Sequence, residues 1–248
     1  MANADLSLWD VLANWKTNCN WVDLSHTLSP KTPHWHGFNA LSEKILFDFD
    51  NAPFKTFEYT TPGQYGTHVD VPSHFDPEGR PMDQIDIKEM VYPLCVIDKS
   101  DACALNADYA LTIDDVREWE NTHGKIPEGA LVAFRSDWYK RDSVAFENRD
   151  KDGNAHYPGW EPETIKWLVE ERNIGSIGHE PPDTDPAALQ HVSGFAGEEY
   201  ILKQDRVQFE LLKNLDLVPA TGAIAFCMFP KLEGGTGFSM RCMAICPK

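Results

Sequence analysis

The segment TPGQYGTHVDVPSHFDPEGR, residues 61–80, places two histidines and an aspartate within seven positions. Its glycines and prolines interrupt any regular helix, so the sequence predicts a strand that ends in a turn. Alternate side chains of a strand lie on one side, so His68 and Asp70 can bind one ion together, with His74 delivered by the turn. The same spacing also fits a polar cluster that is held only by hydrogen bonds.

The composition predicts one globular domain that spans residues 1–248. With 42% hydrophobic residues, a chain of 248 residues can bury a full core. The sequence contains no internal repeat, no low-complexity tract and no linker rich in glycine and serine. Nothing in it therefore marks a boundary between two domains.

The charge of the chain excludes several classes of partner. Lys and Arg number 22 against 39 Asp and Glu, which gives a formal net charge of −17. Such a chain repels nucleic acid and anionic membrane surfaces. The sequence shows no secretory leader and no apolar run near the roughly 20 residues of a membrane helix, so we expect a cytoplasmic protein. Its six cysteines form no CxxC pair, and reduced thiols are expected.

Short apolar or alternating runs predict more strands than helices. The expected strands cover residues 21–28, 55–61, 94–99, 130–138, 174–179 and 222–229. The expected helices cover residues 112–124, 161–175 and 198–215. The mixed order of these elements predicts an α/β fold with a barrel-like, strongly bent mixed sheet and a few flanking helices.

The stretch GTHVDVPSH, residues 66–74, resembles the HxGTHxDxPxH signature of the cyclase family of metal-dependent amide hydrolases, which includes kynurenine formamidases and isatin hydrolases. Further segments are similar to the family in the same order: VDLSHTLSPKTPHW, LVAFRSDW, IGSIGHEPPDTDP and ELLKNLDLVPATGAIAFCMFPKLEGGTGFSMR. The resemblance covers nearly the whole chain. It implies a single domain of the swivelling β/β/α type and the hydrolysis of a C–N bond in a small amide or lactam.

The resemblance also implies a set of metal ligands. The histidine of GTH, the aspartate and the histidine of PxH fall on His68, Asp70 and His74. The glutamate that bridges two metal ions in the formamidases falls on Glu210, which opens the run ELLKNLDLVP. All four side chains are of the type that the family uses.

Two positions depart from the formamidase pattern. The leading histidine of the signature is replaced by Gln64, a poor metal ligand that we assign to the substrate side of the site. A second metal histidine of the formamidases, twelve residues before the bridging glutamate, is replaced by Glu198. His191 lies seven residues before Glu198, and a shifted loop would bring it into the same role.

These replacements affect the choice of metal. Each lost imidazole weakens a zinc site, and added oxygen donors favour harder ions such as Mn²⁺ or Mg²⁺. The sequence therefore predicts one or two divalent ions, either Mn²⁺ or Zn²⁺. A single ion ranks ahead of two, as the resemblance to isatin hydrolases implies, although Asp70 and Glu210 could bridge a pair about 3.5–4 Å apart.

The expected reaction is hydrolysis by a metal-activated water, whose pKa falls toward roughly 7. His74 is the first candidate for the catalytic proton carrier, provided that it does not bind the metal, and Glu198 is the second. In the family the loop PHWH, residues 33–36, reaches over the substrate, so Trp35 is expected to stack on a substrate ring. A tryptophan packed on the edge of the domain would explain Trp35 equally well.

Other interpretations remain open at this stage. The same water could open an ester, a lactone or a carbamate, and the altered ligands would also suit a metal-binding module without turnover. His179 and the acidic residues of 180–185 fit either a clamp around the metal ligands or a solvated turn. The expected partners are a small-molecule substrate and a second copy of the chain. A homodimer is expected from the resemblance and from eight tryptophans, more than one core readily hides.

Overall fold

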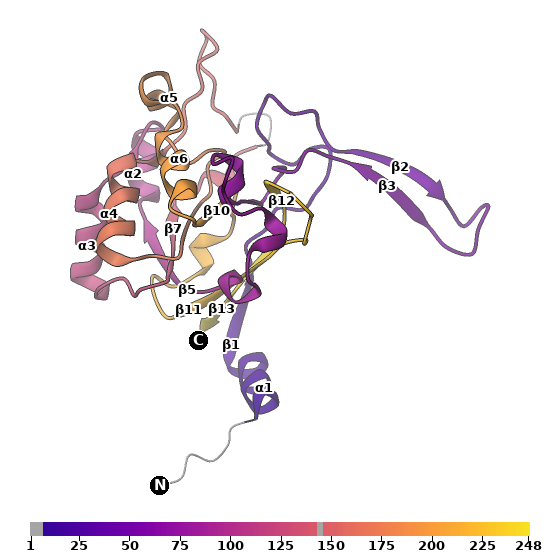
Figure 1. Cartoon of the computed structure of the whole chain (residues 1–248), viewed down its shortest axis with the longest axis horizontal. Helices are drawn as coiled ribbons and strands as arrows, with labels where there is room; N and C mark the ends of the chain where they lie inside the picture. Colours follow the sequence, from indigo (N-terminus) through magenta and orange to yellow (C-terminus); the bar gives the residue numbers. More distant parts are fainter. Residues whose placement is uncertain (1–6, 143–145) are drawn as a thin grey trace.

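The computed structural model describes residues 7–142 and 146–248 and contains one large sheet (Figure 1). Its strands are β1 (Cys19–Asp23), β4 (His68–Asp70), β5 (Val91–Asp98), β7 (Leu131–Arg135), β9 (Ser176–His179), β10 (Val207–Glu210), β11 (Ala223–Met228), β12 (Gly237–Ser239) and β13 (Arg241–Pro247). Two small sheets pair β2 (Ser42–Phe47) with β3 (Thr56–Thr60), and β6 (Ala110–Leu111) with β8 (Gly159–Trp160). The helices are α1 (Leu8–Asn18), α2 (Ser100–Leu105), α3 (Ile113–His123), α4 (Pro162–Arg172), α5 (Ala187–Ser193) and α6 (Ala196–Lys203).

The nine strands of the large sheet follow the order β1-β13-β11-β5-β7-β9-β10-β4-β12. Strands β5, β7, β9 and β10 pair in parallel, whereas the remaining pairings of this sheet are antiparallel. The sheet curls into a half barrel, which confirms the predicted bent mixed sheet of an α/β fold. The parallel strands form its centre, and the candidate ligands His68, Asp70 and Glu210 lie on β4 and β10, toward one end of the strand order.

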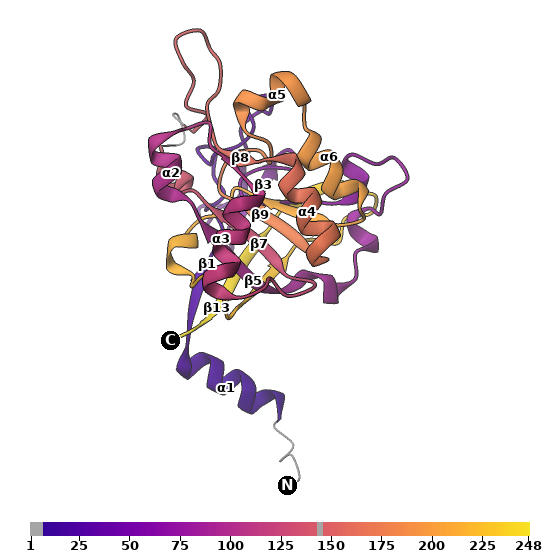
Figure 2. The same ribbon diagram turned by 90° about the vertical axis from the view of Figure 1, so that its left-hand side faces the viewer.

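Two hydrophobic cores lie on opposite faces of the sheet. On β5, Leu94 and Val96 contact one core, whereas Cys95 and Ile97 contact the other. Helices α3, α4 and α6 cover the second core (Figure 2). Burial on both faces explains why the parallel strands read as continuous apolar runs in the sequence.

Most of the predicted elements are present. The strand predicted within residues 64–74 is β4, and the turn that follows it is a short 3₁₀ helix over Pro72–His74. Helix α3 begins at the predicted N-cap Thr112, whose side chain accepts a hydrogen bond from the backbone N–H of Asp115. The first predicted strand is shorter than expected, because β1 ends at Asp23 and leaves His26 in the following loop.

The helix predicted over residues 198–215 is present only as far as Lys203, and its second half is wrong. Helix α6 ends at Lys203, and Val207–Glu210 form β10, between β9 and β4. The left-handed backbone of Asp205, with φ of 56°, interrupts the helical path. Within β10, apolar and polar residues alternate, and this pattern suits a strand with one polar face.

Two segments stand apart from the body of the molecule. The β2–β3 hairpin projects to the right of the body, and α1 extends from its lower end (Figure 1). No side chain of α1 is buried, and the hairpin exposes Phe49, Phe54 and Tyr59 by half or more. Within the described residues, no helix is both long and apolar enough to span a bilayer.

Candidate active site

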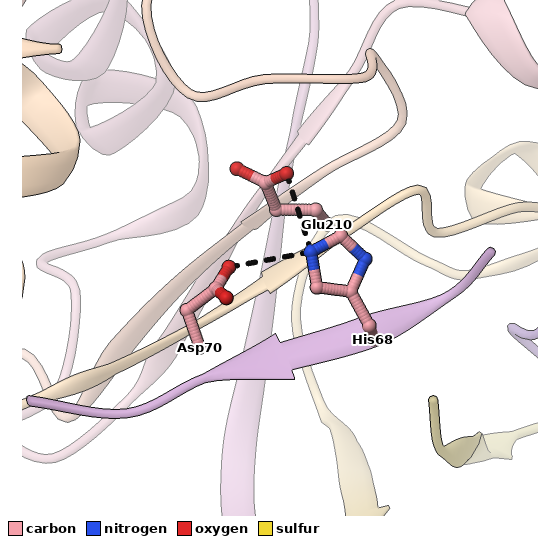
Figure 3. A group of neighbouring side chains, drawn as sticks. All are labelled: His68, Asp70 and Glu210. Atoms are coloured by element: carbon pink, nitrogen blue, oxygen red, sulfur yellow. Dashed lines mark ion pairs between the residues drawn. The ribbon is translucent and has the colours of Figure 1, made fainter. Parts of the chain in front are cut away.

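The pairing of β4 with β10 brings the candidate ligands together. The two strands run antiparallel, with Glu210 opposite His68 and Gln208 opposite Asp70. Because alternate side chains of a strand share a face, all four side chains lie on one side of the sheet. His68 Nε2 lies 3.3 Å from Asp70 Oδ2 and 3.5 Å from Glu210 Oε2 (Figure 3).

The backbone fixes the orientation of the His68 ring. Its Nδ1 lies 2.8 Å from the carbonyl oxygen of Gly66 and donates to it, which leaves Nε2 to face the carboxylates. Gly66 has a φ of 63°, and a Cβ at this position would lie 2.8 Å from Cγ2 of Thr32. Glycine is therefore required at this turn for both conformational and steric reasons.

The 3₁₀ turn and helix α6 add two further side chains. His74 Nε2 lies 3.9 Å from Asp70 Oδ1 and 3.8 Å from Glu198 Oε1. Glu198 is buried, whereas a third (33%) of the His74 side chain is exposed. His74 is therefore the solvent-facing member of this group.

Among the described residues, three overlapping groups of side chains place potential ligand atoms within 4.8 Å of one another. These groups are His68–Asp70–Glu210, Asp70–His74–Glu198 and Asp183–Glu198–Glu210. Asp70, Glu198 and Glu210 each belong to two groups, so the groups form one continuous cluster. His191 belongs to none of them and is exposed on α5, so Glu198, not His191, is part of the cluster.

The carboxyl groups of the cluster repel one another. Burial raises the pKa of Glu198 and of Glu210 well above the usual range, and neighbouring carboxylates raise both further. The pKa of Asp183 rises to about 8, first because of burial and then because of the charge of Asp185. Burial also acts to raise the pKa of Asp70, but the adjacent His68 outweighs it, and that pKa falls below its usual value.

A divalent cation fits this set of donors. Asp70 Oδ1 is buried and has no hydrogen-bond partner among the described residues. Several carboxylates with raised pKa values face one small volume, where a cation would relieve their repulsion. Carboxylate oxygens and imidazole nitrogens are ligands of both Mn²⁺ and Zn²⁺. The residues present thus suit the metal that the sequence predicts.

Gln208 is a member of the cluster that the sequence analysis missed. Its buried Nε2 donates to the carboxylates of Asp70 at 3.3 Å, Glu198 at 3.0 Å and Glu210 at 3.1 Å. Its Oε1 accepts a hydrogen bond of 2.7 Å from Thr184 Oγ1. The sequence predicted a helix here, and in a helix Gln208 and Glu210 would not share a face. In the strand β10 they do, so Gln208 joins the cluster.

The acidic turn after β9 is buried, so the structure excludes a solvated turn. Glu180 and Asp183 are at most 5% exposed, and His179 is fully buried. His179 Nε2 lies 3.4 Å from Glu210 Oε1. Burial, followed by the charge of His68, lowers the pKa of His179 to about 3, so its ring is neutral. The turn therefore packs around the cluster, as the alternative of a clamp requires.

The cluster lines a cavity of about 200 Å³ with largely aromatic walls. Besides the members of the cluster, the lining contains Trp35 and Gln64, the two residues that the sequence predicts to contact the substrate. The Gln64 amide nitrogen lies 3.3 Å from Thr236 Oγ1. Three phenylalanines that were not predicted from the sequence complete the walls, namely Phe38, Phe75 and Phe195. These phenylalanines come from three separate segments, so no local sequence pattern indicates that they line one cavity.

A larger groove of about 620 Å³ lies elsewhere on the molecule. It is lined by residues 23, 25–28, 228–230 and 239–241, among them His26 and Arg241. Its lining contains no member of the three ligand groups. We therefore place the chemistry in the smaller cavity, where the polar cluster meets aromatic walls.

A curled mixed sheet, a buried cluster of His, Asp and Glu, and an aromatic cavity are together the features of a metal-dependent hydrolase. The family model described as putative cyclase matches residues 22–186. The chain belongs to this cyclase family.

Individual relatives agree with this assignment. The chain is 32% identical over 243 residues to the isatin hydrolase of Roseibium aggregatum, with 92% of each chain covered. It is 30% identical over 174 residues to the kynurenine formamidase of Geobacillus thermodenitrificans, which covers 67% of this chain and 70% of that one. A crystal structure of an isatin hydrolase bound to the product analogue thioisatinate has a TM-score of 0.93 at 29% identity, with 100% of both chains covered.

Proposed function

We propose that this protein is a metal-dependent hydrolase that opens the C–N bond of a small aromatic amide or lactam. The observation that carries this proposal is a buried cluster of His68, Asp70 and Glu210 that lines a cavity with aromatic walls. The relatives support the class of enzyme predicted from the sequence, because they are named isatin hydrolase and kynurenine formamidase. An isatin-like ring is therefore the first substrate to test.

In this proposal His68, Asp70 and Glu210 hold one divalent ion, and Asp183 and Glu198 offer further oxygen donors. The excess of carboxylate oxygens over imidazoles favours Mn²⁺ ahead of Zn²⁺, and one ion ranks ahead of two. When bound, such an ion polarises a substrate carbonyl and lowers the pKa of a bound water to about 7. Gln208 orients three of the carboxylates through its amide nitrogen.

The walls of the cavity bind and orient the substrate. Trp35, Phe38 and Phe195 offer faces and edges on which a flat ring can stack. The Gln64 amide lies in the same lining and can hydrogen-bond a polar group of the substrate. A flat ring that carries an amide matches this combination of apolar walls and one neutral polar group.

Glu198 and His74 carry the proton in this proposal. Glu198 Oε1, which lies within the cluster and in the cavity lining, takes a proton from the attacking water as a general base. His74 Nε2 lies 3.8 Å from this oxygen and passes a proton to the leaving nitrogen. Glu198 passes its proton on to His74, so both side chains regain their starting states while water loses one proton and the leaving nitrogen gains one.

The test is turnover of a substrate panel by protein loaded with Mn²⁺ or with Zn²⁺. The panel holds isatin, an N-formyl aryl amide, an ester, a lactone and a carbamate. We expect isatin to gain one water, measured by mass spectrometry, and protein stripped by a chelator to be inactive. Hydrolysis of only the ester or lactone would show that the protein cleaves a C–O bond and not the proposed C–N bond. Retained metal without turnover of any compound would instead favour a binding module.

We also propose one domain over residues 1–248, a homodimer and a cytoplasmic location. The pairing of β1 with β13 ties distant parts of the chain into one sheet and supports the single domain. The exposed aromatic side chains of the β2–β3 hairpin support the dimer. The six cysteines are free thiols, as is usual in a reducing compartment. Light scattering and fractionation of cells that express the protein test the last two points.

A further inference from the structure

Residues 34–38 form a loop that carries an aromatic side chain into the lining of the cavity. The Trp35 indole lies 4.8 Å from the ring of His36 and 5.1 Å from the ring of Phe38, measured between centroids. It is 39% exposed, so the cavity wall alone does not enclose it. A side chain this exposed can occupy several rotamers unless its neighbours restrict it.

Gly37 provides the surface on which the indole rests. A Cβ at residue 37 would lie 1.7 Å from Cζ3 and 2.2 Å from Cη2 of Trp35. Both are ring atoms far from the Trp35 backbone, so a side chain at residue 37 would displace the ring. The observed ring position therefore depends on the absence of a side chain at this residue.

Glu147 holds the same loop from a distant part of the chain. Its Oε1 accepts a hydrogen bond of 3.2 Å from the backbone N–H of His36 and lies 3.0 Å from Nδ1 of the same residue. Only 15% of the Glu147 side chain is exposed, so water competes weakly for it. The residue next to Trp35 is thus fixed by both its backbone and its side chain.

Glu147 is itself well anchored. Its second oxygen, Oε2, pairs with Arg149 Nη2 at 2.5 Å, and its carbonyl oxygen accepts a hydrogen bond of 3.0 Å from the N–H of His156. The preceding residue, Phe146, is buried, and its carbonyl oxygen accepts a hydrogen bond of 2.8 Å from Trp138 Nε1. The carboxylate therefore acts as a rigid support for the loop.

We propose that Glu147 and Gly37 are positioning residues that set the Trp35 indole against the cavity and so determine which flat ligands it accepts. Neither residue belongs to the cavity lining, and both act through Trp35. The inference rests on the proposed function for the role of Trp35 as a substrate contact. The position of the indole itself can be measured without any turnover.

The first experiment observes the indole directly. The protein is labelled with 5-fluorotryptophan, and the ¹⁹F resonance of Trp35 is assigned by its loss in Trp35→Phe. We expect Glu147→Ala and Gly37→Ala to shift or broaden this resonance and to leave those of the other tryptophans in place. Glu147→Gln keeps an acceptor oxygen and should restore most of the wild-type signal. Asp152→Asn removes a carboxylate from an exposed site in the same loop and is the matched control.

The second experiment measures ligand binding by the metal-loaded protein, with thioisatinate as the probe. Loss of the hydrogen bonds to His36 should weaken binding by Glu147→Ala about three- to tenfold, at unchanged metal content. With isatin, KM should rise more than kcat falls. Asp152→Asn should bind as the wild type does.

Each outcome decides a separate part of the inference. An unchanged Trp35 resonance in both Glu147→Ala and Gly37→Ala overturns the positioning role. Gly37→Ala and Glu147→Gln keep the test decisive if Glu147→Ala does not fold. A displaced resonance with unchanged thioisatinate affinity overturns the role in ligand choice. If the wild type neither binds thioisatinate nor hydrolyses isatin, the proposed function and the role in ligand choice both fail, and the resonance still decides whether these residues position the indole.

Discussion

Gln208 is a neutral side chain at the centre of a cluster of carboxyl groups. Its amide nitrogen donates to three of them, and Thr184 holds its oxygen, so the direction of the amide is fixed. An amide can satisfy carboxylate lone pairs without adding charge. The cluster can thereby keep its geometry whether or not a cation is bound.

Gln208→Glu should destabilise the metal-free protein more than the metal-loaded protein. The change adds a carboxyl group where carboxyl groups already repel, and we expect a loss of about 1–3 kcal/mol in the free energy of unfolding without metal. Urea unfolding with and without Mn²⁺ measures the difference. Gln204→Glu, at an exposed position after α6, is the control. An equal loss in both forms would contradict the proposed role of Gln208.

His68→Ala should lose metal and activity together. His68 Nε2 is oriented toward Asp70 and Glu210 by the bond from Nδ1 to Gly66. Its removal should lower metal affinity by at least about 10–100-fold, the effect of changing residues that only support ligands. Elemental analysis and an isatin assay measure both quantities, with the exposed His191→Ala as the control. Full metal occupancy in His68→Ala would refute the assignment of this ligand.

At the scale of elements, local spacing predicted the part of the site that lies within one segment, the family resemblance added Glu210, and neither indicated Gln208. His68, Asp70 and His74 are close in sequence, so one strand and one turn bring them together. Gln208 meets Asp70 only because β10 pairs with β4, and this pairing of distant segments leaves no local signal. The helix predicted there was wrong because an apolar spacing that runs through α6 and β10 resembles a single helical face.

The turn between β9 and α5 contains a buried carboxyl group, Glu180. Its Oε2 accepts hydrogen bonds from the N–H groups of Ser136 at 3.0 Å and Trp138 at 3.1 Å, whereas Oε1 has no partner among the described residues. Burial is the main cause that raises the pKa of Glu180 from 4.5 to about 8, and Asp137 adds to it. Between these values the folded protein holds a proton that the unfolded chain has lost.

The free energy of unfolding of the metal-free protein should therefore decrease as the pH rises from about 5 to 8. One such proton contributes at most about 1.4 kcal/mol per pH unit. Glu180→Gln keeps an acceptor for the two N–H groups and should remove this contribution, whereas the exposed Glu78→Gln should not. Urea unfolding at several pH values tests it. If the free energy of unfolding of wild type and of Glu180→Gln depended equally on pH, Glu180 would be ionised in the folded state over this whole pH range.

At the scale of the whole molecule, the β2–β3 hairpin is the main candidate for contact with a second copy. A two-stranded hairpin is at best marginally stable alone in water, and this one exposes Phe49 by 72% and Phe54 by 50%. Phe49→Ser together with Phe54→Ser should weaken self-association by about tenfold or more, because apolar area is lost from the contact. Light scattering over a concentration series measures this. Leu105→Ser, at an exposed apolar site on α2, is the control, and a monomeric wild type at micromolar concentration would refute the dimer.

The class of fold was predictable from the sequence, but the order of strands was not. A surplus of short apolar runs over helices favours a mixed, bent sheet, which the structure confirms. The order places β13 between β1 and β11, and β12 at the far edge beside β4. Neighbours in the sheet that are far apart in the chain are selected by packing of the whole core, so local patterns cannot specify them.

The position of β13 has a consequence for synthesis on the ribosome. β1 is synthesised early and β11 late, but neither can complete its pairing in the sheet until Arg241–Pro247 has been synthesised and forms β13 between them. Until then, each presents an unpaired edge and apolar side chains, a state that invites association between nascent chains. A chain truncated after Met240 should therefore collect in the insoluble fraction of expressing cells, whereas the full chain should not. Recovery of the truncated chain as a folded, soluble protein would show that β1 and β11 are stable without their shared neighbour.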